Sequence, residues 1–145
     1  MIALGSDHAG DELKQHLKKH FDEIGVEYVD LGFYELKRDD DYPIMAKAVA
    51  RYVQSGKAEK GILLCGTGIG MSLCANKFSG IRAVVASDVF SVRHSRLHND
   101  ANILCLGARV MARGLACELT DLFLNTEFEG GRHAVRVAMF EDDKE

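Results

Sequence analysis

The run Gly61-Ile62-Leu63-Leu64-Cys65-Gly66-Thr67-Gly68-Ile69-Gly70 decides the fold. Its first half, residues 61–65, is almost entirely apolar, which is typical of a parallel strand covered on both faces of a sheet. Three alternate glycines follow, and they let the backbone pass close to a ligand with its N–H groups exposed. A short helix then begins and ends at about Lys77, so its positive end lies at the turn. The run predicts a strand, an anion-binding turn and a helix.

The same pattern extends in both directions from this run. Residues 2–5, 26–31, 81–86 and 102–106 form further strand candidates. Leu13, Leu17 and Phe21 recur at helical spacing, Pro43 suits the first turn of a second helix, and residues 132–140 form the last helix. Strands that alternate with helices form βαβ units with parallel strands. We therefore predict one domain over residues 1–145, a Rossmann-like three-layer α/β/α sandwich with a five-stranded parallel sheet.

Composition limits the partners and the compartment. The chain has 145 residues, 47% apolar and 28% charged, with a net charge of −4, which argues against a nucleic-acid surface. No apolar run approaches the roughly 20 residues that a membrane helix needs. The first residues lack a basic start and turn polar at Ser6, unlike a signal peptide. We expect a cytoplasmic protein with no nucleic-acid or membrane partner.

Polar side chains follow the first and third predicted strands, where ligands bind in such sheets. Asp7 and His8 are suited to acid–base or ligand-binding work on a sugar, although a helix cap explains them equally well. Cys65 ends an apolar run, where a lone thiol in a reducing compartment is a candidate for chemistry. By itself, that thiol is more simply interpreted as a buried core residue.

Two histidines follow the fourth predicted strand. His94 and His98 are four residues apart and could share a helix face, as metal ligands do. No third ligand is evident, and Arg93 and Arg96 would repel a cation. We therefore predict no metal site, with His98 as a proton donor.

Two arginines stand near the C-terminus. Arg132 and Arg136 are one helical turn apart and share a face. Two guanidinium groups in that relation form a natural phosphate fork, although a solvated basic face is the simpler alternative. A dinucleotide fingerprint is a weaker interpretation of the glycine turn. Its third glycine would fall at Met71 or Leu73, although Asp88 lies where a ribose-binding acid would be.

These sequence motifs occur together in one family. The chain resembles ribose-5-phosphate isomerase B over nearly its whole length, through the strings Ser6-Asp7-His8-Ala9-Gly10, Asp41-Tyr42-Pro43, Cys65-Gly66-Thr67-Gly68-Ile69-Gly70, Ala75-Asn76-Lys77, Ser95-Arg96-Leu97-His98-Asn99-Asp100 and Glu129-Gly130-Gly131-Arg132-His133. The resemblance implies an aldose–ketose isomerase without a cofactor, a sheet order of 2-1-3-5-4, and a homodimer or tetramer with shared active sites. The broader family also includes isomerases of allose 6-phosphate, galactose 6-phosphate and tetrulose phosphates.

The resemblance also implies roles for single residues. Cys65 is the base that moves a proton between C1 and C2, and His98 of the partner subunit opens the sugar ring with help from Asp7. Thr67 shuttles hydroxyl protons, and Tyr42 lines the pocket. The anion hole is formed by the backbone of Gly66, Gly68, Ile69 and Gly70. The phosphate is held by His8, Arg132 and Arg136, with Asn99 and Arg109 reaching in from the partner chain.

One difference from some relatives indicates which type of catalytic base the chain resembles. Some relatives use a glutamate at the position of Met71 as the base and lack the cysteine. Met71 has no carboxylate and Cys65 is present, so the chain resembles the cysteine type. A non-catalytic nucleotide or small-molecule binding module is the alternative of another class, but it has no use for Cys65 together with His98.

Overall fold

The computed structural model describes residues 1–32 and 41–141. The elements in chain order are β1 (Ile2–Ser6), α1 (Asp11–Ile24), β2 (Tyr28–Asp30), α2 (Tyr42–Gln54), β3 (Lys60–Cys65), α3 (Ile69–Ala75), β4 (Ala83–Val85), α4 (Val89–Leu97), β5 (Ile103–Gly107), α5 (Arg113–Asn125) and α6 (Arg132–Glu141). Within the described ranges, no helix has the length and apolar character needed to cross a membrane.

All five strands run parallel in one sheet, in the order β2-β1-β3-β5-β4. This confirms the predicted sheet and the order that the resemblance implied. The edge strands β2 and β4 have three residues each and are shorter than the apolar runs that predicted them. Each has a neighbour on one side only, and a short edge strand leaves few backbone groups unpaired.

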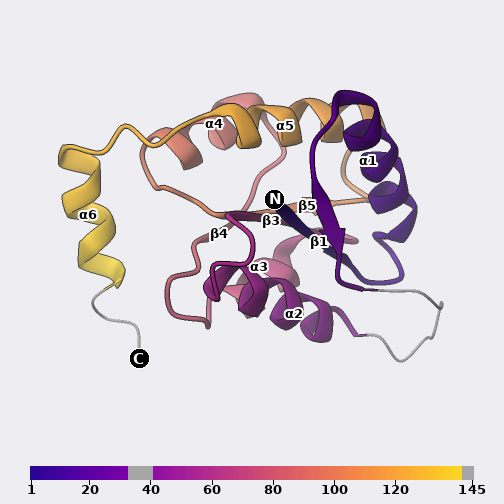
Figure 1. Cartoon of the computed structure of the whole chain (residues 1–145), viewed down its shortest axis with the longest axis horizontal. Helices are drawn as coiled ribbons and strands as arrows, with labels where there is room; N and C mark the ends of the chain where they lie inside the picture. The colour runs from indigo at the N-terminus through magenta and orange to yellow at the C-terminus, as the bar shows by residue number, and fades with distance from the viewer. Residues whose placement is uncertain (33–40, 142–145) are drawn as a thin grey trace.

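Helices cover both faces of the sheet, which confirms the three layers (Figure 1). Leu63 and Cys65 point toward the layer of α2 and α3, whereas Ile62 and Leu64 point toward the layer of α1, α4 and α5. Both faces of β3 are therefore buried, as its continuous apolar run predicts. Pro43 lies in the first turn of α2, as expected.

Helix α6 stands apart from the two helical layers (Figure 1). Of its ten residues, His133 alone is buried. Val135, Met139 and Phe140 leave 60%, 65% and 43% of their surface exposed. An amphipathic helix normally buries such residues against another element, so the apolar side of α6 is uncovered within the described chain.

Candidate active site

The carboxyl ends of β1 and β3 meet at the topological switch point of the sheet. Strand β1 has β2 on one side and β3 on the other, and a crevice forms where the strand order reverses in this way. The backbone N–H of Asp7 donates a hydrogen bond of 3.2 Å to the carbonyl oxygen of Leu64. Asp7 and Cys65, which follow and end these two strands, therefore lie side by side.

Asp7 closes the turn before α1. Its Oδ1 accepts the N–H of Gly10 at 3.0 Å, but Gly10 is the N-cap of α1 and no side chain among the described residues caps the N–H groups of the helix itself. Gly10 itself passes so close to β3 that a Cβ there would lie 2.3 Å from the carbonyl oxygen of Leu64. This tight contact fixes the turn, with Asp7 half-buried and His8 exposed.

The glycine turn is wrapped around the sulfur of Cys65. Cys65 is 5% exposed, and its Sγ accepts the N–H of Gly68 at 3.0 Å. Gly68 has a φ of 83°, a left-handed conformation that turns its N–H back toward β3. The N-terminus of α3 begins at the next residue. The sulfur of Cys65 therefore faces a backbone donor at the start of a helix.

Two further side chains lie at this turn. Thr67 is exposed, and its Oγ1 accepts the N–H of Ile69 at 3.2 Å. The ring of Tyr42 lies 2.6 Å from where a Cβ on Gly70 would be. The absence of a side chain at Gly70 therefore makes room for the tyrosine at the predicted pocket.

Arg109 belongs to the same edge of the same chain. Its N–H donates to the carbonyl oxygen of Gly66 at 3.0 Å, and its side chain lies 3.5 Å from where a Cβ on Gly66 would be. The resemblance implied that Arg109 reaches in from a partner chain. Within the described chain, the β5–α5 loop follows the glycine turn and lays Arg109 over Gly66 of its own chain.

The other predicted residues lie at the opposite edge of the sheet. Helix α4 runs from the carboxyl end of β4 back to the start of β5, so His98, its C-cap, and Asn99 lie at the amino edge. Helix α5 also returns there, and the N–H of Glu129 donates to the carbonyl oxygen of Leu97 at 3.1 Å. Arg132 and Arg136 on α6 follow directly. Within a single chain, these residues and Cys65 therefore lie at opposite edges of the sheet.

His98 lies in a stack of rings. Its ring is 4.0 Å from that of His133 with an interplanar angle of 10°, and it meets His94 edge-on at 4.9 Å. The carboxylate of Glu129 lies 3.5 Å from Nε2 of His133. Burial lowers the pKa of His133, and positive charge on His98 acts in the same direction. Sequence reasoning missed His133 and Glu129, although their spacing of four residues before and into α6 was a possible signal.

The same side chains raise the question of a metal. Donor atoms of His98, Glu129 and His133 lie within 4.8 Å of one another, a set that shares only His98 with the histidine pair that the sequence suggested. Imidazole lone pairs lie in the ring plane, and a metal would sit about 2.0–2.1 Å from each nitrogen. One ion cannot lie in two nearly parallel planes that are stacked. These side chains form a ring stack and not a converging ligand set.

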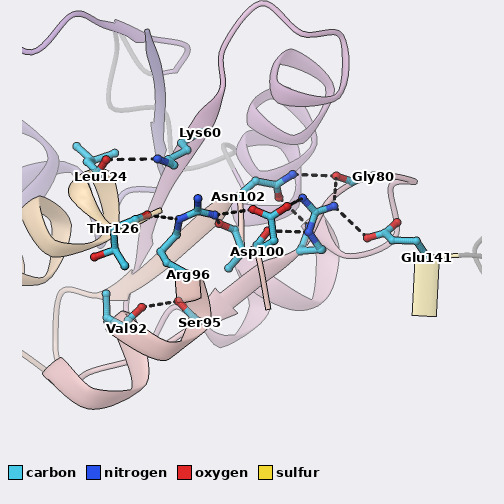
Figure 2. Close-up of polar contacts among 12 residues, drawn as sticks. Lys60, Gly80, Val92, Ser95, Arg96, Asp100, Asn102, Leu124, Thr126 and Glu141 are labelled. Atoms are coloured by element: carbon cyan, nitrogen blue, oxygen red, sulfur yellow. Dashed lines mark hydrogen bonds and ion pairs between the residues drawn. The ribbon is translucent and has the colours of Figure 1, made fainter. Parts of the chain in front are cut away.

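Two arginines hold this edge together around Asp100 (Figure 2). Asp100 has a φ of 50°, and its carboxylate accepts bonds from Arg96 at 3.0 Å and from Arg82 at 3.2 Å. Nε of Arg96 also donates to the carbonyl oxygen of Thr126 at 3.0 Å. Arg82 reaches Glu141 at 3.2 Å. The network thus ties both ends of residues 126–141 to the turn that carries His98.

Comparisons with known proteins agree with this geometry. The model of the family described as Ribose/Galactose Isomerase matches residues 2–140. The chain is 48% identical to ribose-5-phosphate isomerase B of Escherichia coli over 136 residues, 94% of this chain and 91% of the relative. It is 40% identical to D-erythrulose-4-phosphate isomerase of Pectobacterium atrosepticum, over 94% of this chain and 90% of the relative.

Solved structures share the whole fold. Ribose-5-phosphate isomerase B of Clostridium thermocellum matches with a TM-score of 0.93 and 45% identity, over 97% of this chain and 95% of that one. The enzyme of Mycoplasma genitalium with bound ribulose-5-phosphate matches with a TM-score of 0.92 and 36% identity, over 97% and 93%. Fold and relatives together define an aldose–ketose sugar-phosphate isomerase. Within that class, the chain belongs to the Ribose/Galactose Isomerase family.

Proposed function

We propose that the chain interconverts ribose 5-phosphate and ribulose 5-phosphate through ring opening and an enediolate intermediate. The observation that carries the proposal is the contact between the N–H of Gly68 and the sulfur of Cys65, beside Asp7 at the switch point. The E. coli relative named ribose-5-phosphate isomerase B and the M. genitalium structure with bound ribulose-5-phosphate support this substrate.

In the proposed reaction, Cys65 is the base. The proton on C2 of the opened aldose is weakly acidic, and its removal builds negative charge on the carbonyl oxygen. N–H groups of the turn, from Gly66 and Gly70, would stabilise that oxyanion. Those of Gly68 and Ile69, which donate to Cys65 and Thr67 in this structure, would join them once the substrate is bound. Thr67, exposed beside the turn, moves hydroxyl protons. The steps are proton transfers, so the chemistry requires neither a redox cofactor nor a metal.

We infer that a second copy of the chain completes each site. His98 opens the sugar ring in the proposed reaction, yet it lies at the opposite edge of its own sheet from Cys65. A two-fold dimer would bring His98 of the partner subunit to Asp7 and Cys65, and would form two identical sites. The uncovered apolar side of α6 supports such an interface. Pairing of dimers into a tetramer is compatible with the same site.

Phosphate binding positions the reacting carbons from a distance. His8 is exposed at the carboxyl edge, where Arg109 also lies. Asn99, Arg132 and Arg136 are exposed at the amino edge and would come from the partner subunit. Arg109 therefore contributes from the same chain as Cys65, and the other arginines complete the phosphate site across the interface.

A second candidate is the isomerisation of a shorter sugar phosphate. The P. atrosepticum relative, at 40% identity, is named D-erythrulose-4-phosphate isomerase. The same acid–base groups serve a four-carbon chain, because only the distance between the phosphate and the reacting carbons changes. A nucleotide-binding module has less support, because the glycine turn follows β3 and not the first strand.

A substrate panel tests the proposal. The purified protein is assayed with four-, five- and six-carbon aldose phosphates, each with and without excess EDTA. We expect the highest kcat/KM with ribose 5-phosphate and no effect of the chelator. A higher kcat/KM with another sugar would overturn the substrate assignment. Activity that is lost in EDTA and restored by a divalent ion would overturn the metal-free mechanism.

A further inference from the structure

His133 is the one buried residue of α6, whose last residue, Glu141, is also bound by Arg82. It is 6% exposed, whereas every other residue of α6 is exposed or half-buried. Its ring lies against His98, and the two planes are tilted by 10°. A helix that buries a single side chain gains little stability from packing. The specific contact of that side chain therefore suggests a role beyond packing.

The contacts of His98 define its orientation. Its face is covered by His133, its edge meets His94, and its backbone N–H donates to the carbonyl oxygen of His94 at 2.9 Å. His94 is held in turn, because its Nδ1 pairs with the carbonyl oxygen of Phe90 at 2.9 Å. The ring of His98 is therefore fixed on one face and one edge, and the residue stays half-exposed.

We propose that His133 is a positioning residue for His98, which holds the imidazole by stacking in the orientation required to open the sugar ring. The role of His98 in this inference rests on the proposed function. A freely rotating imidazole would meet the sugar oxygen in only a fraction of its orientations. Misplacement of a catalytic group by about 1 Å can cost roughly 10²-fold in rate.

The charges around the stack agree with this role. The titratable and charged groups that face His98 or its stacked partner are His94 from α4, Glu129 from the preceding loop, and Arg132, His133 and Arg136 from α6. Two stacked imidazolium rings would repel each other. Burial lowers the pKa of His133, which favours its neutral ring and so avoids repulsion between two charged rings in the stack.

Steady-state kinetics test the inference. His133→Ala should lower kcat on ribose 5-phosphate by about tenfold to 10²-fold with little change in KM. The equilibrium constant fixes the ratio of kcat/KM in the two directions, so kcat/KM on ribulose 5-phosphate should fall by the same factor. His133→Phe preserves the stack and should restore most of the activity. A loss that appears in KM and not in kcat, or no rescue by Phe, would overturn the inference.

A second measurement does not depend on activity. In a spectrum of histidine-labelled protein, the ring protons of His98 should be shifted upfield by the stacked ring of His133. The shift should persist in His133→Phe and disappear in His133→Ala, with His16→Ala as a control that changes neither the shift nor the kinetics. An unshifted His98 in the wild-type chain would overturn the stacking itself. A wild-type chain with the shift but without isomerase activity would refute the proposed function and leave the stack standing.

Discussion

The backbone N–H of Gly68 donates a hydrogen bond of 3.0 Å to the sulfur of Cys65. The left-handed backbone at Gly68 makes this contact possible, and a Cβ there would lie 3.2 Å from the backbone of Cys105 and 3.0 Å from Val85. The same turn leads into α3, whose first N–H groups have no partner within the helix. The sulfur is thus held at the point where the glycine turn and the start of α3 meet.

Cys65→Ala should therefore lower kcat by about 10²–10⁴, the usual contribution of a general base. Binding of the sugar phosphate should persist, because the phosphate contacts are remote from the sulfur. Steady-state kinetics and calorimetric titration measure the two effects. The matched control is Cys74→Ala on α3, whose half-buried thiol points to the carbonyl oxygen of Pro43 and should be dispensable. Near-normal turnover of Cys65→Ala would exclude this residue as the base.

Alkylation provides an independent check on the same thiol. Iodoacetamide should inactivate the enzyme through Cys65, and saturating sugar phosphate should protect it. Cys105 should not react, because complete burial raises its pKa and negative charge on Cys65 raises it further. Mass spectrometry of peptides after partial labelling identifies the modified residue. Inactivation without modification of Cys65 would contradict the prediction.

Local patterns of the sequence predicted the core of the fold and part of the site. The apolar run of β3 and the glycines after it determine their own conformation, so Cys65 and Gly68 could be placed from the sequence. The stack of His98 on His133 joins the end of α4 to α6, and no local pattern reports such a contact. Spacing also does not tell which chain a side chain serves, and the assignment of Arg109 to the partner came from the family resemblance alone.

Arg132 and Arg136 should serve binding more than chemistry. Arg132→Ala or Arg136→Ala should raise KM for ribose 5-phosphate by about tenfold to 10²-fold, because each removes a charged hydrogen bond to phosphate. The effect on unphosphorylated ribose should be small. Arg93→Ala, an exposed cation on α4, is the control and should change neither constant. Equal effects on both sugars would show that the arginines do not bind the phosphate.

Stability should depend on pH through His133. Burial lowers its pKa in the folded chain, so the unfolded chain binds more protons just below pH 6.5. Protonation of His133 therefore leaves the free energy of unfolding unchanged above that pH and lowers it as the pH falls. The melting temperature of the wild type should therefore fall more steeply between pH 7.5 and 5.5 than that of His133→Phe, which has no titrating group at position 133. Parallel curves for the two proteins would show that His133 does not contribute.

Subunit mixing tests how the site is divided. A chain with Cys65→Ala retains the edge that carries His98, and a chain with His98→Asn retains the edge that carries Cys65. Random exchange between the two inactive proteins should make about a quarter of all sites intact, because half of the dimers are mixed and each has one complete site. Activity should rise toward that fraction as subunits exchange. Absence of recovery after demonstrated exchange would mean that both residues act within one chain.

The position of Arg109 makes the same experiment sharper. Its side chain lies over Gly66 of its own chain, so we expect Arg109 and Cys65 to belong to one half of the site. Mixing Arg109→Ala with His98→Asn should form one intact site in each mixed dimer. The kcat/KM, measured at substrate concentrations well below KM, should rise accordingly. Mixing Arg109→Ala with Cys65→Ala should restore none, because each site of the mixed dimer then retains one defect. Recovery in this second pair would mean that Arg109 acts across the interface, and the same-chain assignment would be wrong.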